Sequence, residues 1–210
     1  MAARPSTFDE SFPHLWQAEI LDRPPLISPA RQYVYPQAVE EVERGALQLL
    51  LRKEPGATAV MMTFALGFAD PSLPYGLWSC PNPQQLCAAA GGYVYIVEAD
   101  RPEQWMQVPY RPVVSVHSAM EPNLLLFTGF HSVWALGAGG RAWETGRLSW
   151  EGLRVTEITA HELRGFGWDL MTDTEVAFTV NLANGSHTGG AGPDSGPGFG
   201  PGSGPGSELG

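Results

Sequence analysis

The feature that most constrains the fold of this chain is a succession of short apolar runs separated by Gly, Pro, Asn or Glu-Pro breaks. The runs lie at 57–67, 91–99, 113–120, 124–130, 132–140, 142–150, 153–169 and 175–189. Two breaks, Gly139-Gly140 and Asn184-Gly185, accept the positive φ angles that tight hairpin turns require. Such spacing is typical of antiparallel all-β folds. It predicts a mainly β protein, an antiparallel meander arranged as a sandwich, a barrel or a partial propeller-like sheet.

Signals for helix are few. Pro36 and the acidic residues after it suit the first turn of a helix, but Gly45 interrupts the pattern. We expect a short helix or turn near 37–43 and a strand near 45–52. Residues 81–90 are compatible with one or two helical turns. The expected fold therefore contains little helix.

The two ends of the chain differ from its centre in composition. Residues 189–210 are mostly Gly, Pro and Ser, and such a segment buries too little apolar surface to offset its ordering entropy. We therefore expect a disordered tail at 189–210, a β-rich domain at 36–188 and an irregular N-terminal arm at 1–35. The arm either packs on the sheet or extends away from it, and the sequence leaves both open.

The excess of acidic over basic residues argues against a nucleic acid as the partner. Twelve basic and twenty-two acidic residues give a net charge of −10, whereas nucleic-acid-binding proteins normally present a basic face. No apolar run reaches the length of a membrane helix, and the first residues lack the apolar core of a secretory signal. We therefore expect a cytoplasmic protein that binds neither nucleic acid nor membrane.

The cysteines form no recognisable metal or redox motif. Cys80 and Cys87 are spaced neither as a zinc pair nor as a redox pair. Free thiols are favoured because no secretory signal is evident, and a disulfide across the short loop is the alternative. The histidines also lack the spacing of metal ligands. We expect neither a metal nor a cofactor.

One part of the chain shows a local family resemblance. The run LLLFTGFHSVWALGAGGRAWETGRLSWEG (124–152) resembles the outer strands of quinoprotein-like or WD-type β-propeller blades. A blade takes about 40–50 residues, and known propellers have at least about four blades. The resemblance therefore implies local strand geometry rather than a closed propeller, and it carries no functional residue to this chain.

The most informative side chains are the tryptophans, of which there are seven. Large aromatic side chains either fill the core of a β fold or form a surface that stacks on a sugar, a base or a partner's side chains. Because both interpretations stay open, the candidate binding residues in the second half of the chain are Trp134, Trp143, Trp150 and Trp168, with His131 beside them.

A second candidate is the carboxylate group formed by Asp169, Asp173 and Glu175. If residues 169–174 are a loop between two strands, the three carboxylates could converge on one side. They would then bind a ligand or Ca²⁺, or perform acid–base chemistry. The alternative is a structural turn in which Asp and Thr side chains bond the local backbone.

These observations favour a binding function over catalysis. The sequence contains no nucleophile elbow, phosphate loop or dinucleotide fingerprint. We expect an interaction module that uses an aromatic face to bind a protein partner or a second copy of the chain. One alternative is a small hydrolase or lyase that uses the 169–175 carboxylates with His131 or His161. The other is a structural subunit of a larger assembly.

Overall fold

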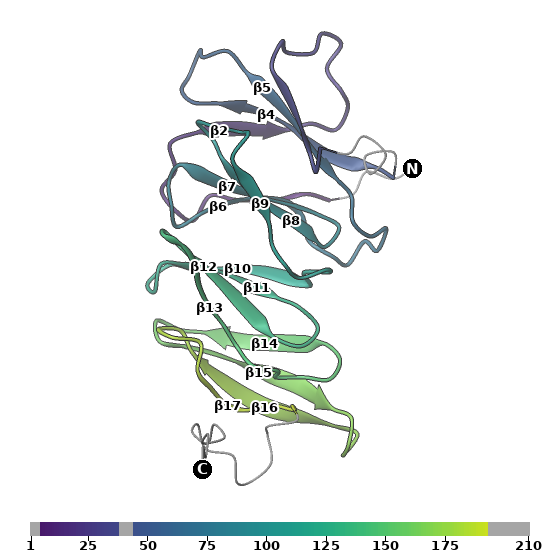
Figure 1. Ribbon diagram of the computed structural model, residues 1–210, viewed down its shortest axis with the longest axis vertical. Helices are drawn as coiled ribbons and strands as arrows, with labels where there is room; N and C mark the ends of the chain where they lie inside the picture. Colours follow the sequence, from purple (N-terminus) through teal and green to yellow (C-terminus); the bar gives the residue numbers. More distant parts are fainter. Residues whose placement is uncertain (1–4, 38–43, 193–210) are drawn as a thin grey trace, which may run out of the picture.

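The computed structural model of the chain describes residues 5–37 and 44–192. These residues form strands joined by turns and loops, and they include no helix. The described part of the chain accordingly has no helix of the length and apolarity that crossing a membrane requires. The strands belong to four sheets, which stack face to face along the longest axis of the molecule (Figure 1).

We number the sheets I to IV in the order of the stack. Sheet I contains, in spatial order, β2 (Gln17–Ile20), β4 (Ala46–Arg52), β5 (Val60–Ala65) and β3 (Gln32–Tyr35). Sheet II contains β1 (Thr7–Asp9), β6 (Tyr75–Ser79), β7 (Gln85–Ala90), β8 (Tyr93–Glu98) and β9 (Trp105–Gln107). Sheet III contains β10 (Ser115–Ala119), β11 (Leu124–Thr128), β12 (Val133–Gly137) and β13 (Gly140–Glu144). Sheet IV contains β14 (Leu153–Ile158), β15 (Glu162–Asp169), β16 (Thr174–Asn181) and β17 (His187–Gly189).

An apolar core fills each space between neighbouring sheets. Each core combines buried residues of two sheets, for example Leu49 and Tyr95 in the first, Val94 and Phe127 in the second, and Leu126 and Phe178 in the third. Sheets II and III are covered on both faces, so β8 and β11 are apolar along almost their whole length. Strand β15, in the last sheet, instead alternates between buried and more exposed residues.

The predicted fold class is confirmed. The chain is mainly β, and nearly all strand pairs are antiparallel; β1 with β6 and β3 with β5 are the parallel pairs among the described residues. Of the three predicted arrangements, a closed barrel is not formed, because the four sheets follow one another in an open row (Figure 1). The strand expected near 45–52 is β4.

Two local predictions have different outcomes. The helical turns expected at 81–90 are wrong, because residues 85–90 form β7, which is paired with β6 on one side and with β8 on the other. That central position buries Cys87 and the three alanines after it, so tertiary packing overrides the helix preference of alanine. The helix or turn expected near 37–43 falls almost entirely on 38–43, which lies outside the described residues.

The ends of the chain also differ from expectation. The described part of the expected arm, 5–35, is not wholly irregular, because it contributes β1 to sheet II and both β2 and β3 to sheet I. Phe12 and Trp16 fix it further by entering the cores. At the other end, most of the expected tail lies outside the described residues, but the described chain continues past 189. Gly190 donates a backbone hydrogen bond to Ala177, and Ala191 donates one to Leu148.

The cysteines match the favoured interpretation. Cys80 and Cys87 are free, and both are buried in the core between sheets II and III. Burial raises the pKa of both thiols, because the apolar surroundings disfavour the thiolate. They are therefore core residues, and no disulfide closes the loop between them.

Candidate functional site

Two of the four candidate tryptophans belong to the core. Trp134 is 1% exposed, and its ring centroid lies 5.4 Å from that of Phe127 between sheets II and III. Trp143 is buried between sheets III and IV, where its Nε1 donates a 2.8 Å hydrogen bond to the Leu182 carbonyl. The Trp134 ring is enclosed in the core, so the prediction of binding is corrected for that residue. Trp143 is 8% exposed and also lines a pocket with His161 and Asn181, so its binding role stays a prediction. Both side chains are large and help to fill the spaces between the sheets.

His131 lies in the turn between β11 and β12, with its side chain exposed. Its Nδ1 atom is 3.2 Å from the Ser149 carbonyl oxygen, and its ring lies beside that of Phe130. The backbone carbonyl of His131 accepts a hydrogen bond from Leu148. These contacts connect the turn between β11 and β12 to the segment that leads into sheet IV.

The carboxylates at 169–175 serve separate partners. Asp169 accepts hydrogen bonds from the Met171 amide (3.1 Å) and the Thr172 hydroxyl (2.8 Å), which is a local turn. Glu175 instead pairs with Arg154, and Asp173 adopts a positive φ of 55°. Within 5–37 and 44–192 there is no group of three or more His, Cys, Asp or Glu residues placed to hold a metal ion. The structural-turn interpretation therefore describes Asp169.

Of the remaining candidates, Trp168 and Glu175 meet on the outer face of sheet IV. The alternation of β15 turns Leu163, Gly165 and Gly167 toward the core and leaves Phe166 and Trp168 half-buried on the other face. A pocket of about 390 Å³ opens there. We call it the sheet IV pocket; it is lined by Glu151, Gly152, Leu153, Arg154, Phe166, Trp168 and Glu175.

An ion pair crosses β15 at the centre of this pocket. Arg154 of β14 is in register with Phe166, and Glu175 of β16 is in register with Trp168. The guanidinium spans the strand between them, with Nη2 2.7 Å and Nε 3.3 Å from the two carboxylate oxygens. Its carbon lies 4.7 Å from the centroid of the Phe166 ring. The pair therefore fixes a planar polar group over the Phe166 ring, in a pocket that Trp168 also lines.

The electrostatics of the pair follow from its exposure. The hydrogen bond and charge of Glu175 raise the pKa of Arg154, which keeps its charge in any case. Both side chains are about half exposed, 55% and 50%, and ion pairs in that setting add little to stability. The pair therefore orders the surface more than it stabilises the fold.

A second arginine covers the remaining candidate tryptophan. The Arg147 guanidinium lies 4.8 Å from the centroid of the Trp150 ring. The Trp150 amide donates a 2.9 Å hydrogen bond to the Trp168 carbonyl, so the two tryptophans belong to adjacent backbone segments. The structure thus brings together Trp150, Trp168 and Glu175 of the predicted residues.

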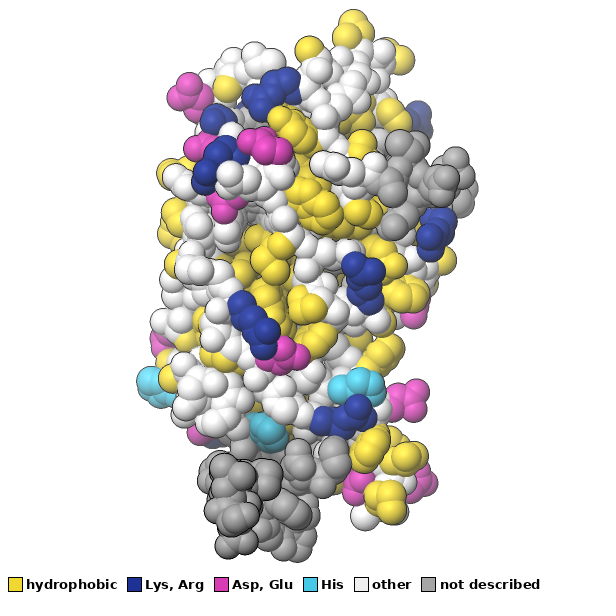
Figure 2. All heavy atoms as spheres, in the orientation of Figure 1, with side chains coloured by type: hydrophobic (Ala, Val, Ile, Leu, Met, Phe, Trp, Pro, Cys, Tyr) yellow, Lys and Arg dark blue, Asp and Glu magenta, His cyan; other side chains and the backbone are white. Residues whose placement is uncertain are grey.

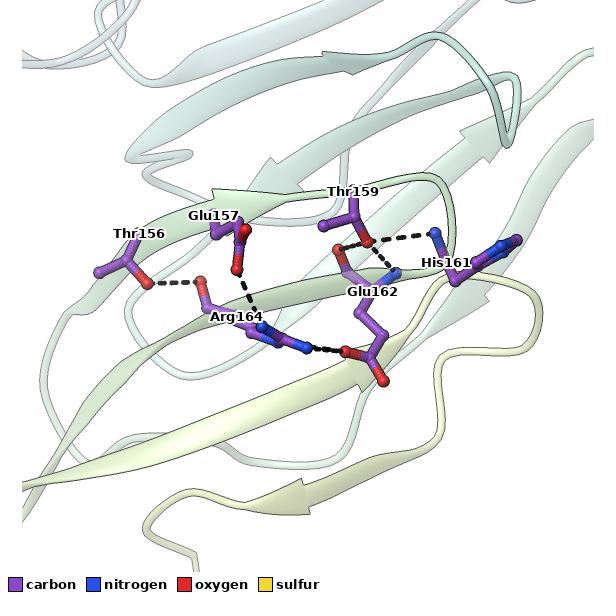
Figure 3. Close-up of polar contacts among 6 residues, drawn as sticks. All are labelled: Thr156, Glu157, Thr159, His161, Glu162 and Arg164. Atoms are coloured by element: carbon purple, nitrogen blue, oxygen red, sulfur yellow. Dashed lines mark hydrogen bonds and ion pairs between the residues drawn. The ribbon is translucent and has the colours of Figure 1, made fainter.

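The other half of the outer face is polar. Figure 3 shows Arg164 between Glu157 and Glu162, with nitrogen–oxygen distances of 3.0 and 2.7 Å. In the adjoining turn, the Thr159 hydroxyl accepts hydrogen bonds from the amides of His161 and Glu162. Such a polar face ends the stack of sheets, because it is compatible with water on its outer side.

A serine–histidine contact is present elsewhere. The Ser115 hydroxyl is 2.8 Å from His117 Nε2, the contact that an activated nucleophile needs. The same hydroxyl is also hydrogen-bonded to Thr128, and burial lowers the pKa of His117. His117 is in register with the core residue Leu126, so this group lies on the face of sheet III that turns toward sheet IV.

The comparisons with known proteins do not indicate a function, so a functional proposal depends on the site alone. No model of a known protein family matches the chain, and a search of curated proteins gave no match either. Sequence reasoning missed Arg154 and Phe166, which complete the pocket. The alternation of Phe166 and Trp168 in 153–169 was a usable signal, whereas the Arg154–Glu175 pair depends on strand register.

Proposed function

We propose that this protein is a binding module that uses the sheet IV pocket and the adjoining Trp150 to bind a protein partner. The observation that carries the proposal is the Arg154 guanidinium over the Phe166 ring, in a pocket that Trp168 also lines, on the face of sheet IV that no other sheet of the described residues covers. Tryptophan, tyrosine and arginine are the residue types enriched in the energetic centres of protein interfaces.

The contrast between the two halves of the face supports a docking role for the aromatic half. A face that only ended the stack would need the polar pattern of Arg164, Glu157 and Glu162 throughout. Half-buried Phe166 and Trp168 depart from that pattern. Burial of their remaining apolar surface against a partner would be favourable, and the ordered Arg154 would bind at a small entropic cost.

The hydrolase alternative has less support. The carboxylates of Asp169 and Glu175 bind different partners, and His131 contacts the backbone carbonyl of Ser149. Acid–base catalysis needs such groups around one reacting atom. The aromatic surface is therefore the better guide to function.

The proposal is tested by capture with two matched variants. Wild-type protein, Trp168→Ala and Thr156→Ala are immobilised and exposed to extract of the source organism, and the retained proteins are quantified by mass spectrometry. Thr156 lies on the same sheet, and its hydroxyl contacts the Arg164 carbonyl in the polar half. Thermal melting first confirms that both variants fold.

We expect at least one protein, in a fixed ratio to the wild type, to be retained by Thr156→Ala and lost with Trp168→Ala. Replacing a tryptophan at the centre of an interface with alanine costs about 2 kcal/mol or more of binding free energy. The affinity of Trp168→Ala for the partner should therefore fall at least about thirtyfold. Equal retention by all three proteins would exclude the sheet IV pocket as the docking surface.

A further inference from the structure

The turn between β15 and β16 carries two large, exposed apolar side chains. Leu170 is 63% exposed and Met171 is 83% exposed. Hairpin turns normally carry Gly, Asn, Asp or Ser, so adjacent exposed apolar residues at such a site need a physical reason. In Figure 2, hydrophobic and acidic side chains gather at the lower right, where Figure 1 places this turn.

The turn is held in one conformation by its own side chains. Asp169 bonds the Met171 amide and the Thr172 hydroxyl, and the Thr172 hydroxyl lies 2.8 Å from that of Thr174. Asp169 and Thr174 form the last pair of residues between β15 and β16 before the turn. Because the backbone is already ordered, entry into a partner would cost Leu170 and Met171 side-chain entropy but little backbone entropy.

The turn is also continuous with the sheet IV pocket. Asp169 directly follows Trp168, and Thr174 directly precedes Glu175, so the apolar turn begins where two residues that line the pocket end. We propose that Leu170 and Met171 are the apolar anchor that inserts into a socket of the same protein partner. This inference rests on the proposed function and names the part of the surface that enters the partner.

The charges around the turn indicate the chemistry of the socket. Asp169 and Asp173 place two carboxylates at the turn, whereas the charge of Glu175 is paired with Arg154, and the chain as a whole has a net charge of −10. A complementary partner therefore has an apolar cavity with Lys or Arg at its rim, which would also accelerate association. An anionic membrane surface would repel the same carboxylates, so a protein is the favoured occupant.

The chain provides a matched control for this anchor. Leu26 and Ile27 are also adjacent and exposed, at 106% and 89%, but they lie between β2 and β3 at the other end of the stack. We compare Leu170→Ser/Met171→Ser with Leu26→Ser/Ile27→Ser, because the control pair is at least as exposed as the anchor pair. A third variant, Asp173→Asn, removes one charge and keeps a residue that tolerates the positive φ of 55°.

The test measures binding of full-length variants to the purified partner whose capture depends on Trp168. We expect Leu170→Ser/Met171→Ser to raise the dissociation rate at least about tenfold and Leu26→Ser/Ile27→Ser to leave it unchanged. Asp173→Asn should slow association and weaken its dependence on salt.

Three outcomes would overturn the inference, in different ways. Normal binding by Leu170→Ser/Met171→Ser, with loss by Trp168→Ala, would remove the anchor and leave the proposed function intact. The absence of any Trp168-dependent partner would remove both. Binding of the wild type to phosphatidylcholine vesicles that Leu170→Ser/Met171→Ser abolishes would assign the turn to a lipid surface instead.

Discussion

At the scale of single residues, buried hydroxyl groups replace backbone pairing where the chain passes between sheets. The Ser79 hydroxyl accepts a hydrogen bond from the Phe12 amide (2.9 Å), and the Thr145 hydroxyl accepts one from the Val133 amide (3.0 Å). Both hydroxyls are buried. A buried amide without a partner costs about 1–3 kcal/mol, so these side chains are part of the framework of the stack.

Two histidines make stability depend on pH at this scale. Burial lowers the pKa of His117 and of His187 below the ordinary value of 6.5. Between those lowered values and 6.5, the unfolded chain binds protons that the folded chain excludes. The free energy of unfolding is therefore highest above pH 6.5 and falls as the pH drops through the folded-state pKa.

We expect His117→Gln to reduce this loss of stability between pH 7.5 and pH 5. Urea unfolding at the two pH values measures it, and the exposed His161→Gln serves as the control. The informative quantity is the difference between the two pH values for each protein, which cancels the cost of the substitution itself. An identical pH dependence in wild type and His117→Gln would contradict the assignment.

At the scale of elements, β15 shows how the last sheet packs on the chain before it. A Cβ added at Gly167 would lie 2.1 Å from the Leu148 carbonyl oxygen, and one added at Gly165 would lie 2.4 Å from that of Arg154. Glycine at 167 lets the segment before β14 approach the inner face of sheet IV, and glycine at 165 lets the backbone of β14 itself pass close to β15. Inner positions 165 and 167 therefore have no room for a side chain, and the aromatic residues of β15, Phe166 and Trp168, lie on the outer face.

The corresponding prediction concerns Gly167→Ala. The clash is with backbone, which cannot rotate away, so we expect a loss of about 3 kcal/mol in the free energy of unfolding. Gly139→Ala is the matched control, because an added Cβ there meets no atom within 4 Å. Chemical denaturation measures both variants. Equal stability of the two would mean that sheet IV does not pack on Leu148 as described.

Strand positions were largely predictable because turn residues separate the apolar runs. Residues 153–169 and 175–189 contain β14 to β17, and Asn184-Gly185 lies in the turn before β17. The alanines of β7 were not predictable, since only the pairing of that strand on both sides makes it extended. The short strands of the first 35 residues lack a local signal and depend on their partners in sheets I and II.

The candidate site was predictable only in part, for a similar reason. Composition identified tryptophans as informative, but local sequence does not separate buried Trp143 from half-buried Trp168. That distinction depends on which face of each sheet is covered by the next. The pairing of Arg154 with Glu175 likewise depends on the register of β14, β15 and β16, which the sequence leaves open.

At the scale of the whole molecule, truncation can locate the residue at which the folded part of the chain ends. Deletion of 193–210 should change the melting temperature by no more than about a degree, because its composition predicts no buried surface. Deletion of 190–210 should lower it by several degrees. That variant also loses the hydrogen bonds of Gly190 and Ala191 to Ala177 and Leu148. Calorimetry compares the two; an equal effect would contradict the boundary.

The parallel pairing of β1 with β6 has a consequence for how the molecule acquires its shape. Thr7 pairs with Gly76, whereas the strand partners in sheets III and IV are near neighbours in sequence. During synthesis, sheet II cannot gain its first strand until the chain has emerged beyond β6, and closing so long a loop is entropically costly. Sheets III and IV meet no such delay. The N-terminal half therefore has the higher contact order, and its formation should limit the folding rate.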